Sequence, residues 1–369
     1  MRPFSLLIKP TGPDCNLQCN YCFYTGKSSL FTPGRHRMSD EVLEKLIVDF
    51  LKLNLLASSF AWQGGEPTLM GLDFYKKVVH LQQKHGKPGQ VVSNALQTNA
   101  ILLDEQWCDF LNEYKFLVGI SLDGPKKYHN HYRLDHSGSG SFTKVMAAID
   151  CCRRKNVEFN ILVLLNDRNV IAPDELFDFF VEQEIRYLQF TPCVESQDDF
   201  KITPYSITPS QYGDFLCRIF DRWYEYGSDK ISVRIFDSIL SYLLGNGHTL
   251  CTFSQKCNDY IVVEHTGDVF CCDFFVGDDY KLGNIFETPI EKLANSKRKK
   301  DFAEKKRDVH NNCFVCKYLN ICRGGCLKDR TVTQKSCKIP SYFCQAYKLF
   351  FDYSLPKFMQ IAANISQPK

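Results

Sequence analysis

The sequence has no long hydrophobic run and almost no excess charge, and these absences exclude several classes of protein. No apolar stretch approaches the length of a membrane-spanning helix, and residues 1–9 hold only a short apolar run, too brief for a signal peptide. The net charge of +3 gives no indication of a nucleic-acid surface. Internal repeats and low-complexity segments are also absent. We therefore expect a cytoplasmic protein with neither membrane nor nucleic-acid partners.

The sequence is unusually rich in cysteine. It contains 18 cysteines, while its hydrophobic share of 44% and charged share of 24% are those of an ordinary folded protein. In a reducing compartment, such thiols bind metals or take part in chemistry more often than they form disulfides. Four of them lie within helical patterns and are interpreted as structural: Cys108, Cys151, Cys152 and Cys217.

Strand and helix patterns alternate six times over about the first two hundred residues. Strands are expected at 4–9, 59–63, 91–98, 116–122, 157–165 and 187–190, with helices at 39–55, 72–85, 104–114, 141–155 and 174–184. This alternation predicts an α/β fold, a parallel sheet with helical crossovers that is closed or nearly closed into a barrel. Six units fall short of the eight in a complete (β/α) barrel.

The composition changes towards the C-terminus. A further helix is expected at 208–226, a hairpin at 260–271 and a last amphipathic helix at 342–362. Ten cysteines fall in this part: Cys251, Cys257, Cys271, Cys272, Cys313, Cys316, Cys322, Cys326, Cys337 and Cys344. We expect a barrel domain over 1–230 and a metal-organised domain with the C-terminal helix over 231–369.

Three cysteines follow the first expected strand at a C-x3-C-x2-C spacing: Cys15, Cys19 and Cys22. Barrel enzymes keep their chemistry at this end of the strands. Three thiolates can hold three corners of a cubane iron-sulfur cluster and leave the fourth iron open to a small chelating ligand. A zinc site or a disulfide knot is the alternative, but zinc needs a fourth ligand, and the next histidine, His36, is fourteen residues on.

With an aromatic residue, Tyr21, between its last two cysteines, this stretch resembles the radical S-adenosylmethionine superfamily. The resemblance implies a partial (β/α)6 barrel, similar to a TIM barrel, whose open side admits a large substrate. It also implies that S-adenosylmethionine binds at the open iron.

Gly64-Gly65-Glu66-Pro67 follows the second expected strand. Two glycines let a ligand approach the backbone, and Glu66 offers an acceptor to an ammonium group, although a capped turn would look the same. The resemblance implies that this turn holds the methionine amino group of the cofactor. It further implies cofactor contacts at Tyr21, Gly64, Gly65, Glu66, Ser121, Arg133 and Val194.

The C-terminal cysteines Cys313-x2-Cys316-x5-Cys322-x3-Cys326 are too dense for chance, although a zinc ribbon is a rival. Together with four others they suffice for two four-cysteine clusters, and the layout resembles the SPASM extension of peptide-modifying radical enzymes. The resemblance implies a first auxiliary set of Cys251, Cys257, Cys272 and Cys326, and a second auxiliary set of Cys313, Cys316, Cys322 and Cys344. Three [4Fe-4S] clusters result. Cys271 and Cys337 are left over, and Cys271 could compete with Cys272.

Asp273 directly follows a predicted ligand, and its carboxylate can accept a proton or cap a turn. The whole chain resembles the anaerobic sulfatase-maturating enzymes. Four stretches carry this resemblance: the cysteine loop, Trp62–Leu69, Leu122–Pro125 and Cys272–Phe274. The resemblance implies that Asp273 is the catalytic base. It implies oxidation of a Cys or Ser of an unfolded sulfatase polypeptide to Cα-formylglycine, with a flavodoxin or ferredoxin as electron donor.

Two departures from that pattern bear on substrate preference: Ala100 stands where a Gly is usual, and Cys271 precedes Cys272. Another peptide modification, a thioether crosslink or an epimerisation, remains an alternative with the same cofactors. A zinc-binding adaptor without catalysis is the alternative from another class.

Overall fold

The computed structural model describes residues 3–197 and 199–366, which form two compact units built from several chain segments. The first unit comprises the residues up to Ser121, His129–Phe159 and Asn258–Ala303. The second comprises Leu122–Tyr128, Asn160–Cys257 and the residues from Glu304 on. The outer ends of the two predicted domains, residues 1 and 369, lie outside the described residues.

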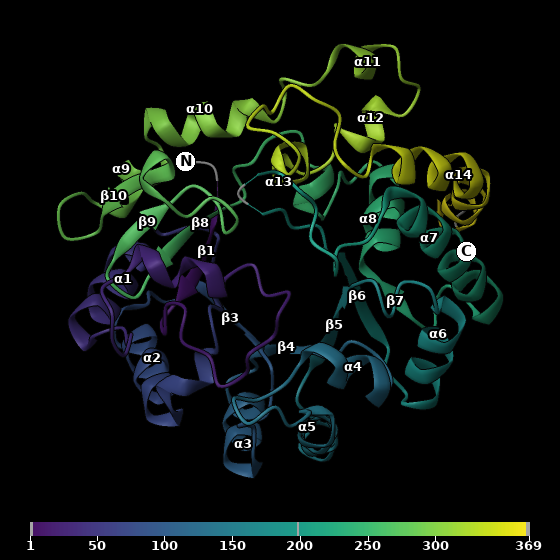
Figure 1. Ribbon diagram of the computed structural model, residues 1–369. Helices are drawn as coiled ribbons and strands as arrows, with labels where there is room; N and C mark the ends of the chain where they lie inside the picture. The colour runs from purple at the N-terminus through teal and green to yellow at the C-terminus, as the bar shows by residue number, and fades with distance from the viewer. Residues whose placement is uncertain (1–2, 198, 367–369) are drawn as a thin grey trace. The chain divides into compact units, whose positions relative to one another are not determined.

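The first unit is built on a sheet in the order β10-β9-β8-β1-β2-β3-β4 (Figure 1). Strands β8, β1, β2, β3 and β4 run parallel, and β9 and β10 add antiparallel strands at one edge. Their bounds are β1 Ser5–Lys9, β2 Ala57–Trp62, β3 Val91–Thr98, β4 Leu117–Ser121, β8 Tyr260–Glu264, β9 Asp268–Phe270 and β10 Lys281–Asn284.

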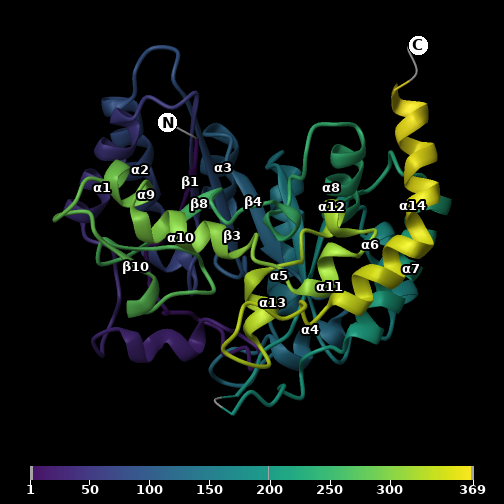
Figure 2. The same ribbon diagram turned by 90° about the horizontal axis from the view of Figure 1, so that it is seen from above.

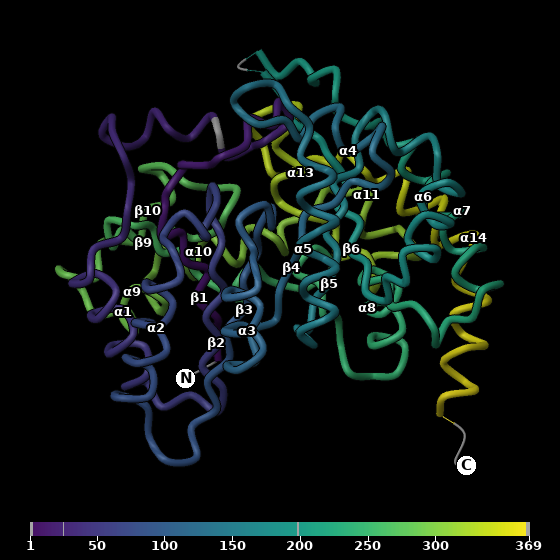
Figure 3. The backbone as a smooth tube through the Cα atoms, turned by 90° about the horizontal axis from the view of Figure 1, so that it is seen from below, coloured from purple at the N-terminus to yellow at the C-terminus, as the bar shows by residue number. Residues whose placement is uncertain are grey.

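Helices cover this sheet because their apolar faces need burial against it. Alternate residues of β1, Leu6 and Ile8, are fully buried. Helices α1 and α2 lie side by side (Figure 3). The helices of the unit are η1 Thr25–Leu30, α1 Asp40–Lys52, η2 Pro67–Met70, α2 Leu72–His85, α3 Glu105–Glu113, α5 Phe142–Arg154, η4 Asp278–Tyr280, α9 Ile290–Ala294 and α10 Lys297–Lys305, whose last two residues belong to the second unit.

Side-chain caps begin several helices where the sequence supplies them. The Ser39 hydroxyl accepts a hydrogen bond from the Val42 amide at 3.2 Å, and the Asp104 carboxylate accepts one from the Trp107 amide at 2.9 Å. Each cap satisfies an amide that the first turn leaves without an intrahelical partner. These caps fix where α1 and α3 begin.

The second unit combines three parallel strands with helices and the cysteine-rich segment. Its strands are β5 Phe159–Leu165, whose first residue belongs to the first unit, β6 Tyr187–Pro192 and β7 Ser232–Val233, in that order. Its helices are α6 Pro173–Glu182, α7 Pro209–Tyr226, α8 Arg234–Leu243, η3 Cys251–Phe253, α11 Asn311–Phe314, α12 Leu319–Cys322, α13 Leu327–Thr331 and α14 Cys344–Ser366. Helix α14 runs along α7 (Figure 2), where Gly213 allows the close approach of Ala346.

The predicted α/β alternation is confirmed, and the expected helix 72–85 and strand 91–98 have the bounds of α2 and β3. Helices α4, Lys126–Tyr132, and α8 and strand β10 were not predicted. The predicted hairpin is present as β8 and β9, and β8 pairs in parallel with β1, Leu6 lying opposite Ile261. The sheet of the first unit therefore contains residues from both predicted domains. Among the described residues, no helix has the length and apolar character that crossing a membrane requires.

Candidate functional site

The loop after β1 carries three predicted cluster ligands and is held through its backbone. The Cys22 amide donates to the Cys19 carbonyl at 3.0 Å, so these two cysteines share one tight turn. The Gln18 amide donates to the Leu134 carbonyl at 2.7 Å, which ties the loop to the chain after α4. Cys15, Cys19 and Cys22 are all half-buried.

The three thiols of this loop influence one another. Burial raises the pKa of the Cys15 thiol to about 12, and the charges of Glu66, Cys19 and Cys22 act in the same direction. A thiol in this position keeps its proton at neutral pH unless a cation replaces it. Among the described residues, no three His, Cys, Asp or Glu side chains converge tightly enough for a single metal ion. As a donor set, three neighbouring cysteines fit an iron-sulfur cluster.

Asp14, directly before the first of these cysteines, anchors the start of the loop. Its carboxylate accepts hydrogen bonds from the His36 amide at 2.9 Å and from Arg37 Nη1 at 2.7 Å, and its other oxygen lies 2.7 Å from His36 Nδ1. Burial acts to raise the pKa of Asp14, but these bonds outweigh it and lower that pKa. Asp14 and His36 were not predicted as site residues.

The glycine turn after β2 packs directly on the cysteine loop. The Gly65 amide donates to the Gly12 carbonyl at 2.9 Å, and the Glu66 amide donates to the Asp14 carbonyl at 2.8 Å. A Cβ atom on Gly65 would clash with the Asp14 carbonyl. Gly65 therefore makes room for the backbone of the cysteine loop.

Glu66 is buried, with 1% of its surface exposed, and is fully hydrogen-bonded. Its Oε1 accepts from the Thr68 amide, the Thr68 hydroxyl and the Thr98 hydroxyl at 2.6–3.0 Å, and its Oε2 accepts from the Asn99 amide at 2.8 Å. Burial raises the pKa of Glu66, while these bonds oppose the rise. In this structure its carboxylate caps the turn, as the alternative interpretation of the sequence holds, and its contact with a cofactor amino group stays a prediction.

Two predicted cofactor contacts lie side by side. The Arg133 guanidinium lies over the Tyr21 ring, 5.5 Å from its centroid, and Arg133 is largely buried. Tyr21 lies between two predicted ligands, so this stacking brings a cation to the edge of the cysteine loop. Ser121, at the end of β4, accepts a hydrogen bond from Gln97 Nε2 at 3.2 Å.

Val194, another predicted cofactor contact, belongs to the second unit. It is fully buried, and its carbonyl accepts a hydrogen bond from Lys328 Nζ, which also pairs with the Glu195 carboxylate at 2.6 Å. Its contact with a cofactor stays a prediction.

Asp273, the predicted base, follows β9 and is paired with a buried lysine. Its Oδ1 forms an ion pair with Lys9 Nζ, and the two side chains are 9% and 1% exposed. Lys9 Nζ also lies over the Tyr24 ring, 3.5 Å from its centroid. The cysteine loop and the Asp273 segment meet again where the Phe23 and Phe274 rings lie 4.9 Å apart.

Lys9, Tyr24 and Glu264 were missed by the sequence reasoning. The Tyr24 hydroxyl donates to Glu264 Oε1, and Glu264 is fully buried at the end of β8. Burial first, and then the Glu264 charge, raise the pKa of Tyr24 well above its usual range. A signal was present, because Lys9 and Glu264 each end a strand whose other buried residues are apolar, and a buried charged residue needs a partner.

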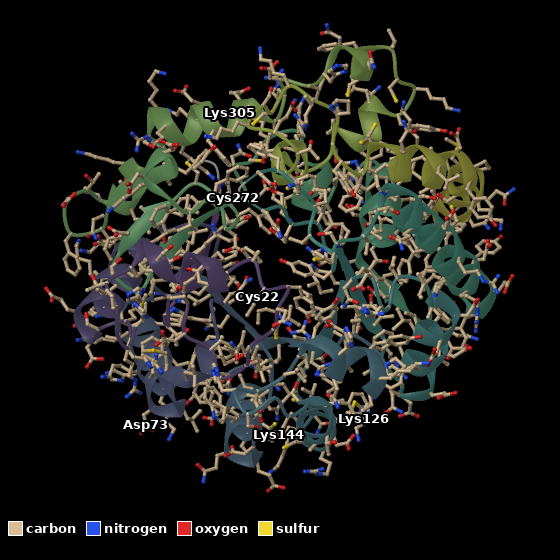
Figure 4. All side chains as sticks on the ribbon, viewed as in Figure 1. Cys22, Asp73, Lys126, Lys144, Cys272 and Lys305 are labelled. Atoms are coloured by element: carbon tan, nitrogen blue, oxygen red, sulfur yellow. The ribbon has the colours of Figure 1, made fainter. Side chains whose placement is uncertain are left out.

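Cys271 and Cys272 have different surroundings. Cys271 is buried, and its carbonyl accepts a hydrogen bond from Lys299 Nζ at 2.8 Å. Cys272 is half-buried, and its sulfur lies 3.2 Å from the Tyr260 hydroxyl. Figure 4 labels the half-buried Cys272 and Cys22, and also Asp73, whose exposed side chain lies at the start of α2.

The second auxiliary set lies wholly in the second unit. Burial raises the pKa of the Cys322 thiol to about 12, and the charges of Cys344, Cys313 and Cys316 add to the rise. Cys316 and Cys313 share a turn, since the amide of the former donates to the carbonyl of the latter at 3.1 Å. Four thiols that influence one another fit a four-cysteine cluster.

The first auxiliary set is divided between the units. Cys251, Cys257 and Cys326 belong to the second unit and Cys272 to the first. The grouping of these four thiols around one cluster therefore stays a prediction.

Two family models match the chain. The radical SAM superfamily model covers residues 10–180, and the SPASM model, an iron-sulfur cluster-binding domain, covers residues 251–317. The predicted domain boundary at 230/231 falls between the two matches and stays a prediction.

Curated relatives match almost the whole chain. A cysteine-type anaerobic sulfatase-maturating enzyme from Clostridium perfringens (strain ATCC 13124) is 39% identical over 369 residues, which cover 99% of this chain and 100% of the relative. A serine-type anaerobic sulfatase-maturating enzyme from Bacteroides thetaiotaomicron is 36% identical over 374 residues, which cover 96% and 90%. These relatives are enzymes, so the zinc-binding adaptor is no longer a candidate.

A solved structure agrees with these matches. Native anSMEcpe with bound AdoMet and Cp18Cys peptide matches with a TM-score of 0.92 and 38% identity, covering 99% of this chain and 100% of the other. The fold is thus mixed α/β with a parallel sheet of the radical SAM type, followed by a SPASM domain. At this identity over its full length, the chain belongs to the anaerobic sulfatase-maturating enzyme family of radical SAM proteins.

Proposed function

We propose that this chain oxidises a Cys or Ser side chain of an unfolded sulfatase polypeptide to Cα-formylglycine. The observation that carries the proposal is the buried Asp273–Lys9 ion pair beside the cysteine loop, in a chain related to both the cysteine-type and the serine-type enzymes. A carboxylate in that position is suited to take a proton from the substrate.

S-adenosylmethionine, when bound at the first iron-sulfur cluster, supplies a 5'-deoxyadenosyl radical that removes a hydrogen atom from the substrate Cβ. Cys15, Cys19 and Cys22 would hold that cluster. Tyr21 and Arg133, which stack on each other, are suited to orient the cofactor, Arg133 through its carboxylate.

Asp273 would accept the thiol or hydroxyl proton as the substrate loses its remaining electron to the auxiliary clusters. Lys9 is the ion-pair partner of this carboxylate, and only an ionised carboxylate can accept a proton. A serine substrate gives the aldehyde directly. A cysteine substrate gives a thioaldehyde, which water converts to the aldehyde with release of hydrogen sulfide.

The partners follow from this chemistry. A low-potential donor of the flavodoxin or ferredoxin type would reduce the first cluster. The polypeptide would be modified in the cytoplasm before it folds, where thiols stay reduced.

Replacement of Asp273 by Asn tests the proposal. The protein is incubated without oxygen with S-adenosylmethionine, dithionite and a sulfatase-type peptide, and deoxyadenosine and peptide products are measured by mass spectrometry. We expect cofactor cleavage to continue while aldehyde formation falls by about a hundredfold or more, the scale of a lost general base.

Asp268→Asn is the matched control, since Asp268 is an ion-paired aspartate of the same hairpin, 2.9 Å from Lys281 Nζ. It should form aldehyde at the normal rate. Full aldehyde yield from the Asp273→Asn variant would refute the role of Asp273. A cysteine-type peptide that keeps its sulfur and has lost only two hydrogens would indicate a crosslink in place of formylglycine.

A further inference from the structure

Arg330, in α13 of the second unit, is a buried cation with no ion-pair partner among the described residues. Only 1% of its surface is exposed, and arginines this buried are normally paired with a carboxylate. Its guanidinium instead donates to four backbone carbonyls at 2.9–3.3 Å, and within the described part of the chain it forms no ion pair. The four carbonyls belong to Gly324, Asp308, Lys306 and Arg323.

The chain wraps around this guanidinium between two predicted ligands. Arg323, Gly324 and Gly325 have φ angles of +50°, +74° and +69°, three consecutive residues in the left-handed region. A Cβ atom on Gly324 would clash with Arg330 Nη2, so glycine is required for this approach. The wrapped turn joins Cys322 of the second auxiliary set to Cys326 of the first.

Cysteines of both auxiliary sets interact electrostatically with Arg330. Burial lowers the pKa of Arg330, and negative charge on Cys313, Cys257, Cys326 and Cys322 opposes that effect. Cys313 and Cys322 belong to the second auxiliary set, and Cys257 and Cys326 belong to the first. Thiols are neutral, so this opposing charge exists only when the cysteines are thiolates bound to metal.

Lys306 is a second buried cation whose hydrogen bonds go to backbone carbonyls. It is 1% exposed, and its Nζ donates to the carbonyls of Cys251 and Thr252. Two buried cations bound to carbonyls thus lie beside the auxiliary cysteines. The buried Asp329 carboxylate acts electrostatically on both, and metal-bound thiolates would supply further negative charge.

We propose that Arg330 is the shared counter-charge of both auxiliary clusters, a positioning residue that joins the two ligand sets and raises the reduction potential of each cluster. Reduction adds a negative charge next to a fixed positive one, so the guanidinium favours the reduced state. In the proposed reaction this makes both clusters better acceptors of the substrate electron. The inference rests on the auxiliary clusters of the proposed function and not on the identity of the peptide.

Potentiometric titration monitored by electron paramagnetic resonance tests this inference on the anaerobic, fully loaded protein. In the variant Arg330→Gln, the ratio of reduced to oxidised auxiliary cluster at a fixed potential should be at least tenfold lower. This corresponds to a fall in the reduction potential of about 59 mV or more for one electron. The reduction potentials of both auxiliary clusters should fall, and the potential of the first cluster should stay unchanged. Arg307→Gln is the matched control, because Arg307 is a half-exposed arginine of the same unit, and its potentials should equal those of the wild type.

Arg330→Lys separates charge from hydrogen bonding. It should keep its iron and shift each auxiliary potential by less than half as much as Arg330→Gln. Unshifted potentials in an iron-complete Arg330→Gln protein, or equal shifts in both variants, would overturn the proposal.

If Arg330→Gln does not retain iron, Arg330→Lys decides the question. Retained iron with near-normal potentials supports the counter-charge, and loss of iron in this variant too contradicts it. A wild-type protein with three clusters that forms no aldehyde would refute the proposed function and leave the titration unaffected.

Discussion

Lys9 ends a β1 strand whose other buried residues are apolar, and it connects the cysteine loop to the Asp273 segment. Its Nζ pairs with Asp273 and lies over the Tyr24 ring, while the side chain is 1% exposed. Removing one partner of such a pair leaves the other as an uncompensated buried charge. Lys9 therefore compensates the buried charge of its ion-pair partner Asp273.

We predict that Lys9→Met lowers the free energy of unfolding of the loaded protein by about 3 kcal/mol, the scale for breaking a buried ion pair. Adding Asp273→Asn to Lys9→Met should recover part of the loss, because it removes the isolated charge. Urea unfolding of the two single variants and the double variant measures the coupling.

Lys45→Met is the control for this cycle, because Lys45 pairs with Asp49 at 2.6 Å on the half-exposed surface of α1. Its cost should stay below about 1 kcal/mol. Strictly additive losses for Lys9→Met and Asp273→Asn would show that the two side chains do not depend on each other.

At the scale of residues, the sequence indicates candidate ligands through local spacing, but it does not indicate their surroundings. The spacing of Cys15, Cys19 and Cys22 is local, so the loop could be read directly from the chain. Lys9 and Glu264 are more than 250 residues apart in sequence, and only parallel pairing of β1 with β8 brings them to one end of the sheet. Arg330 shows no motif at all, because its partners are backbone carbonyls.

Among the elements, the glycine turn after β2 and the cysteine loop form one packed pair. Gly65 and Glu66 donate their amides to the carbonyls of Gly12 and Asp14, and the space beside Gly65 is filled by the Asp14 carbonyl. The turn thus determines the position of the loop that carries the three predicted cluster ligands.

We predict that Gly65→Ala displaces the cysteine loop and lowers stability by about 1–3 kcal/mol, the usual cost of overpacking. The protein should then lose the first cluster and retain about eight of about twelve irons, since each cluster holds four. Iron analysis with Mössbauer spectroscopy provides the measurement.

Gly26→Ala serves as the control, because no atom lies within 4 Å of a Cβ built on Gly26. It should keep all its iron. A Gly65→Ala protein with a full complement of iron and wild-type stability would contradict the packing argument.

Elements with strong periodicity were predictable, since α2 and β3 follow local patterns that tertiary contacts do not override. Strand β10 was not, because its residues Lys281–Asn284 include a glycine and no apolar alternation. The pairing of β8 with β1 was not predictable either, because a hairpin carries no signal of the strand beside it.

At the scale of the molecule, neither unit holds the complete chemistry. The first unit contains the cysteine loop, the glycine turn, Cys272 and Asp273, and the second contains the other auxiliary cysteines. In the proposed function, radical formation would draw on the first unit, and the ligands of the auxiliary clusters would come from both units.

The stoichiometry of a single anaerobic turnover assay tests this account most directly. The wild-type protein, loaded with about twelve irons, is given S-adenosylmethionine, a reductant and a sulfatase-type peptide. We predict one 5'-deoxyadenosine for each Cα-formylglycine formed. Deoxyadenosine without any aldehyde on the peptide, or iron for the first cluster only, would contradict the account.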